Sequence, residues 1–175
     1  MARLENLLGA QALALSDRLW AARGGGPIVG SASERAALVT LLAHPDRSVS
    51  WLGGVLGLTS SGVTRLVERL VAAGWVTRTA GSDARRRQLS LTAAGRDRGQ
   101  AMLDARRAAM TDALGGLSAR DRAELERLLE VIVGRLAETR LPALQVCRLC
   151  DRAACGSGGS ECPLQHTVAS DDTNG

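Results

Sequence analysis

The hydrophobic period of the chain changes from helical to alternating in one short region, and this change limits the possible folds more than any other feature. Residues 75–79 and 88–91 alternate apolar and polar side chains, which is typical of short strands. Turn-forming residues, Gly81, Ser82 and Asp83, lie between them. The remaining apolar runs repeat at a helical spacing. The sequence therefore predicts a mainly α protein with one small β-hairpin.

Several predicted helices begin at residues with the character of an N-cap. These are Ser31 with Glu34 three residues later, Ser48, Thr59 or Ser60, Thr92, and Ser118 with Asp121. A first helix carries Leu4 to Leu19 and stops before the loop at 24–27. At the other end, Pro142 is expected to stop the last helix.

The two short helices before the hairpin are joined by Gly57, which suits a tight turn. The second of them has an apolar face at Val63, Leu66, Val67, Leu70 and Val71. Its opposite face carries Ser60, Ser61, Thr64, Arg65, Glu68 and Arg69. Two helices at a glycine turn, followed directly by a hairpin, predict a winged helix-turn-helix.

Positive charge gathers in the same region. Residues 65–87 hold six arginines and two acids, so this stretch carries the whole net charge of +4. A localised basic stripe is what an anionic polymer surface requires. An α-helix with short hydroxyl and arginine side chains fits the major groove of DNA, and an arginine-rich hairpin can follow the phosphates or enter the minor groove.

The predicted DNA contacts come from the second of the two short helices, which begins at Thr59 or Ser60, and from the hairpin. They are Ser60, Ser61, Thr64, Arg65, Arg69, Arg86 and Arg87, with the two hairpin arginines the weaker candidates. The alternative for each residue is an ordinary cap or a solvated surface charge. Trp51 and Trp75 are expected in the core rather than at the interface.

The order of these features resembles the MarR family of bacterial regulators over residues 3–141. The most specific match is the run Asp83-Ala84-Arg85-Arg86-Arg87-Gln88-Leu89-Ser90-Leu91-Thr92-Ala93-Ala94-Gly95, and a second is Gly62 to Leu70 leading into Gly74-Trp75-Val76 and Arg78. The resemblance implies that Asp83 orders the wing and that Arg85 enters the minor groove. It also implies a homodimer whose first and last two helices interleave, and a repressor that releases operator DNA when a ligand or oxidant favours a different spacing of the two recognition helices.

The predicted organisation has five parts. They are an N-terminal dimerisation helix and loop (1–30), a winged helix-turn-helix (31–95), C-terminal dimerisation helices (96–141), a cysteine-rich tail (142–168) and a disordered end (169–175). An apolar stripe at 125–136 needs a partner to cover it, which independently favours a homodimer.

All four cysteines lie in the tail, in a C-x2-C-x4-C-x6-C pattern made by Cys147, Cys150, Cys155 and Cys162. Clustered thiols outside an oxidising compartment indicate metal ligands or redox groups before structural disulfides. Zinc bound by four thiolates, with His166 as an alternative to one of them, and an iron–sulfur cluster both fit the spacing. A thiol–disulfide switch and uncoordinated thiols are the remaining alternatives.

These observations predict a cytoplasmic, DNA-binding transcriptional regulator with double-stranded operator DNA as its partner and a small-molecule, metal or redox effector. The chain has no apolar run long enough for a membrane span, and no signal peptide is expected. An enzyme is not expected, because paired carboxylates, a nucleophile with its base and a phosphate loop are all missing from the sequence. The alternative is a small metal carrier or electron-transfer protein that uses its winged helix for protein contacts.

Overall fold

The computed structural model describes residues 2–21, 30–80, 87–157 and 161–168. Its α-helices are α1 (Arg3–Ala21), α2 (Ala32–Ala43), α3 (Val49–Leu56), α4 (Ser60–Ala72), α5 (Ala93–Ala113), α6 (Ala119–Gly134), α7 (Arg140–Val146) and α8 (Arg152–Cys155), and Gln165–Thr167 form a 3-10 turn. Its strands are β1 (Arg47–Ser48), β2 (Val76–Ala80) and β3 (Arg87–Leu91). The fold is the predicted one, mainly α with a winged helix-turn-helix.

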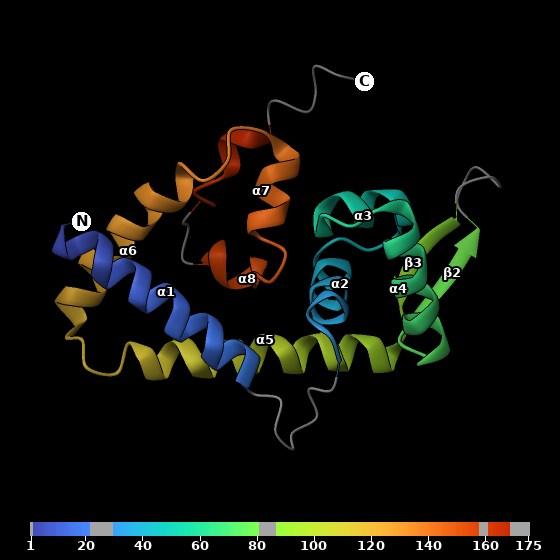
Figure 1. Ribbon diagram of the computed structural model, residues 1–175, viewed down its shortest axis with the longest axis horizontal. Helices are drawn as coiled ribbons and strands as arrows, with labels where there is room; N and C mark the ends of the chain where they lie inside the picture. Colours follow the sequence, from blue (N-terminus) through green and yellow to red (C-terminus); the bar gives the residue numbers. More distant parts are fainter. Residues whose placement is uncertain (1, 22–29, 81–86, 158–160, 169–175) are drawn as a thin grey trace.

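Helix α5 runs along one side of the molecule (Figure 1). The winged helix-turn-helix lies at its N-terminal end, and α1 lies along its other half. The main core lies between α2, α3, α4, the sheet and the start of α5. Its fully buried side chains include Leu38, Leu41, Leu52, Leu66, Leu70 and Leu89. With no Phe or Tyr in the chain, leucine and valine fill this core.

The predicted N-caps are confirmed. Ser31 and Glu34 form a complete capping box, and the hydroxyls of the other caps accept amide hydrogen bonds three residues on: Ser48 from Trp51, Thr59 from Gly62, Thr92 from Gly95 and Ser118 from Asp121. Gly57 has φ 63°, the left-handed turn expected between α3 and α4. These local signals therefore determine where the helices begin.

The sheet has one strand more than the predicted hairpin. β2 and β3 pair antiparallel, with Val76 opposite Leu91 and Ala80 opposite Arg87. The unpredicted β1 pairs with the other edge of β3, giving the order β1-β3-β2. A strand of two residues has no hydrophobic period, so the sequence pattern could not reveal it.

Two details of the helix prediction were wrong. The helix that the sequence predicts up to Pro142 is shorter, because α6 ends at Gly134 and Pro142 lies in the first turn of α7. A proline is tolerated there because a first-turn amide has no partner within the helix. Val71, predicted on the buried face of α4, is 38% exposed. The five domain ranges remain predictions.

Helices α1 and α6 expose much apolar surface. Leu4, Leu7 and Leu8 of α1 are about half or more exposed, and none of the 16 described residues of α6 is buried. The exposed apolar side chains of α6 are Leu128, Leu129, Val131 and Ile132, with Leu136 just beyond its end. Among the described helices, none combines the length and apolar character that spanning a membrane requires.

Candidate functional site

The outer face of α4 is accessible. Ser60, Ser61, Thr64, Arg65 and Arg69 are all exposed, whereas Val63, Leu66, Val67 and Leu70 hold the opposite face in the core. Thr59 caps the helix by accepting a hydrogen bond from the Gly62 amide at 3.2 Å. The structure therefore brings the predicted recognition side chains together on one solvent-facing surface.

Two close contacts fix α3 and α4 against each other. The backbone turns at Gly57, and Gly53 of α3 lies so near α4 that an added Cβ would stand 3.0 Å from a methyl group of Val63. Leu58 adds an amide hydrogen bond to the carbonyl of Gly53 at 2.9 Å. The position of the α4 surface is thus set by rigid backbone rather than by flexible side chains.

Arg69 has a protein partner as well as an exposed surface. Its Nε donates to Oε1 of Glu34 on α2 at 2.9 Å, and the guanidinium side chain remains 56% exposed. Burial would raise the pKa of Glu34, but hydrogen bonds from Arg69 and the Ser31 amide, with the Arg69 charge, lower it overall. Its role as a DNA contact stays a prediction.

The strands of the wing lie beside α4 (Figure 1). Arg78 of β2 is exposed, and Arg87 begins β3 opposite Ala80. Asp83, Arg85 and Arg86, the predicted wing-tip residues, lie outside the described residues. Trp75, just before β2, packs against the core as expected and lies under the Arg98 guanidinium, 4.1 Å from the ring centre.

The four cysteines line a common cavity of about 320 Å³ between α7, α8 and residues 161–165. Cys147 follows α7, Cys155 ends α8, and all four are free thiols. A hydrogen bond between Cys147 and Cys150 raises the pKa of Cys147 and lowers that of Cys150 to about 6. Among the described residues, no three Cys, His, Asp or Glu side chains already converge on one ion-sized point.

His166 does not line the cysteine cavity. One of its ring nitrogens, Nε2, lies 3.1 Å from the carbonyl oxygen of Ala137, at the start of the loop between α6 and α7. This contact gives the imidazole a structural partner away from the thiols.

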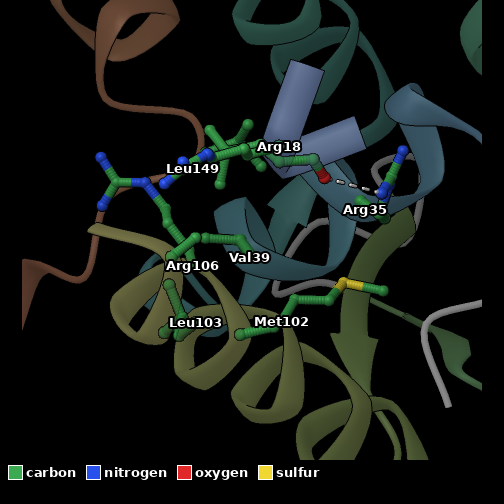
Figure 2. Close-up of a pocket in the computed structure, with 10 residues that line it drawn as sticks. Arg18, Arg35, Val39, Met102, Leu103, Arg106 and Leu149 are labelled. Atoms are coloured by element: carbon green, nitrogen blue, oxygen red, sulfur yellow. Dashed lines mark hydrogen bonds between the residues drawn. The ribbon is translucent and has the colours of Figure 1, made fainter. Parts of the chain in front are cut away.

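The structure contains a second cavity that the sequence did not predict. It has a volume of about 80 Å³ and lies where α1, α2, α5 and Leu149 meet (Figure 2). Its walls are mainly apolar, from Val39, Met102 and Leu103, and three arginines stand around it: Arg18, Arg35 and Arg106. Arg35 is only 5% exposed and donates to the Leu19 carbonyl at 3.4 Å. The arrangement suits a small anion with an apolar body.

Comparison with known proteins agrees with this geometry. Residues 31–87 match a model of the MarR family. A MarR family protein from Bacillus stearothermophilus is 26% identical, with a TM-score of 0.66, over 74% of this chain and 89% of that one. A probable transcriptional regulator from Pseudomonas aeruginosa is 29% identical, with a TM-score of 0.54, over 74% and 99%.

A third similar structure is a MarR family protein from Mycobacterium tuberculosis in complex with salicylic acid. It is 28% identical, with a TM-score of 0.58, over 75% of this chain and 97% of that one. No curated protein matches the chain. The helix-turn-helix region of this chain, over residues 31–87, is thus similar to the MarR family, and its fold is that of solved MarR family proteins.

Proposed function

We propose that the chain is a transcriptional regulator that binds double-stranded operator DNA and represses the adjacent genes. The observation that carries this proposal is the exposed face of α4, where three hydroxyl side chains and two arginines lie beside the wing strands. A helix of this kind enters the major groove, where arginine pairs with guanine and hydroxyls reach bases or phosphates. The basic wing then lies along the neighbouring backbone.

The regulator acts as a homodimer. Apolar residues exposed on α1 and α6 form more unpaired surface than scattered single leucines would, and such surface indicates an interface. A two-fold dimer places two copies of α4 about 34 Å apart, one turn of DNA. Its operator is therefore a pseudo-palindrome with half-sites about one helical turn apart.

The cavity among Arg18, Arg35 and Arg106 is the proposed effector site. A carboxylate would pair with the guanidinium groups, and an apolar ring would contact Val39 and Met102. The similar M. tuberculosis protein was solved with salicylic acid, which has this chemistry. Because α1, α2 and α5 all line the cavity, an effector there shifts the dimer toward a spacing of the α4 helices that no longer fits DNA.

The operator can be found by selecting genomic fragments on immobilised protein and footprinting the bound fragments. We expect protection of two half-sites whose centres lie about ten base pairs apart. Adding salicylate as a probe should release the DNA, and Arg18→Gln should weaken that response without changing affinity in its absence. Protection of no specific fragment would contradict the DNA-binding proposal, whereas protection that saturating salicylate leaves unchanged would contradict only the effector site.

A further inference from the structure

The cysteine cavity is formed by segments that the chain brings together from different directions. Cys147 lies at the C-terminal end of α7, Cys150 in the following turn, Cys155 at the end of α8 and Cys162 beyond it. No cysteine occurs elsewhere in the chain. Four thiols around a single cavity, with none on any other surface, indicate a common ligand rather than four unrelated core or surface residues.

The backbone places the thiols as two neighbouring pairs. The Cys150 amide donates to the Cys147 carbonyl at 2.9 Å, a turn that puts both side chains of the C-x2-C segment on the same side. Cys155 is likewise a hydrogen-bonding neighbour of Cys162. Binding of one metal centre by all four thiols requires their side chains to move closer together, because no three of them already converge on one point among the described residues.

Positive charge outweighs negative charge around this cavity. Arg140, Arg152 and Glu161 line it; Arg106 of α5 and Arg148 favour a Cys150 thiolate electrostatically, and Asp151 disfavours it. Four thiolates at half-buried or exposed positions carry four negative charges, and nearby positive charge favours their ionised form. The arginines supply part of that positive charge, and a bound cation would supply the rest.

The region around the cysteines has little core of its own. Its buried apolar residues are Ala137, Ala143, Leu144 and Leu164, and Val133 and Val146 pack against this cluster. An apolar cluster of this size contributes little to the stability of the fold. Small regions without a sufficient core are often stabilised by a bound metal. A metal crosslink would therefore stabilise the short α8 and the 3-10 turn at Gln165–Thr167.

We propose that Cys147, Cys150, Cys155 and Cys162 bind a thiolate-ligated metal centre that holds this segment together. Four sulfur ligands select a soft or borderline metal, either a zinc ion or an iron–sulfur cluster. A zinc ion requires the sulfurs to close onto one tetrahedral point, with Zn–S bonds of about 2.3 Å. A cluster keeps them further apart around a larger volume, which the cavity of about 320 Å³ provides.

The test is elemental and absorption analysis of full-length protein purified without oxygen, with Cys147→Ser and Cys162→Ser as variants, one from each pair. His166→Ala is the control, since its ring contacts the Ala137 carbonyl. Zinc at one equivalent per chain, or iron with sulfide and a visible charge-transfer band, supports the proposal and tells the two centres apart. Both cysteine variants should lose the metal, and His166→Ala should keep it.

A titration with Co²⁺ covers the case in which the serine variants fail to fold. The reduced, metal-free wild-type chain should bind one Co²⁺ with the absorption of a tetrahedral thiolate complex, and Zn²⁺ should displace it. Replacing one cysteine ligand should lower the affinity for the metal by at least roughly tenfold, the loss that follows removal of a group that only supports a ligand. The proposal would be overturned if the reduced, metal-free chain bound neither Co²⁺ nor iron with sulfide. It would also be overturned if both cysteine variants kept the metal content of the wild type.

Discussion

Glu34 joins the start of α2 to the position of α4. Its Oε2 accepts a hydrogen bond from the Ser31 amide at 2.8 Å, while its Oε1 accepts from Arg69 at 2.9 Å. The side chain is 14% exposed, so solvent screens the ion pair less than a surface pair. One carboxylate therefore both completes the capping box and holds the proposed recognition helix against its neighbour.

Replacing Glu34 by Gln should lower the free energy of unfolding at pH 7 by about 1 kcal/mol, because the charged cap and the ion pair are both lost. The folded-state pKa of Glu34 is lowered, so this stabilisation is fully present above the unfolded value of 4.5 and is lost as pH falls through the folded value. Urea unfolding at pH 7 and at pH 3 measures it. The gap between variant and wild type should narrow at pH 3.

The matched control is Glu124→Gln. Glu124 pairs with Arg127 on α6, but both side chains are more than half exposed, so little change is expected. If Glu34→Gln lowered the free energy of unfolding equally at pH 7 and at pH 3, the charge of Glu34 would not stabilise the fold.

Helix α5 contains two glycines with different surroundings, Gly95 and Gly99. Gly95, in its first turn, lies against the carbonyl of Trp75 so closely that any Cβ would collide with backbone. Gly99, one turn later, has its nearest neighbour, the Leu38 carbonyl oxygen, at 3.5 Å from an added Cβ, an ordinary contact. The first glycine is thus required by the approach of α5 to the wing, and the second is not.

Gly95→Ala should therefore destabilise the fold by about 2–3 kcal/mol, as overpacking against a rigid neighbour does. Gly99→Ala should be neutral, or stabilising by up to about 1 kcal/mol through helix propensity. Thermal unfolding of the two variants measures the difference. Equal effects of the two substitutions would show that α5 does not depend on the close approach at Trp75.

The helices and the hairpin could be predicted because their signals are local. Ser31, Ser48, Thr92 and Ser118 each cap the helix expected from the sequence. The end of α6 was misplaced because apolar residues continue past Gly134 as far as Leu136 and conceal the break. The arginine-lined cavity was not predicted, since Arg18, Arg35 and Arg106 meet only through the packing of three helices.

The described part of the molecule buries one face of every helix of the winged helix-turn-helix but leaves α1 and α6 with open apolar faces. The cysteine segment is attached to the winged helix-turn-helix, because Gln145 donates to the Gly54 carbonyl at 3.0 Å and Thr40 to the Arg148 carbonyl at 3.2 Å. The apolar faces of α1 and α6 are therefore the surfaces available to a second copy of the chain in the proposed dimer.

Replacing both Leu128 and Ile132 by Glu should convert the proposed dimer to a monomer, since two charges would be buried without partners. Light scattering coupled to gel filtration measures the mass. Ala94→Glu adds a charge to an exposed position of α5, near the winged helix-turn-helix, and should leave the dimer intact. A double variant that remains dimeric would place the interface elsewhere.

The most direct test of DNA recognition by α4 is the salt dependence of operator affinity for wild type, Arg65→Ala and Arg120→Ala. The two variants lose the same charge from exposed positions, one on α4 and one on α6. If Arg65 contacts a phosphate, Arg65→Ala should bind the operator more weakly, and the slope of log K against log salt should be smaller by about 1. If Arg65 contacts a base, Arg65→Ala should lose about 1–3 kcal/mol of binding free energy. Arg120→Ala should match wild type, and an Arg65→Ala protein as tight and as salt-sensitive as wild type would contradict recognition through this face.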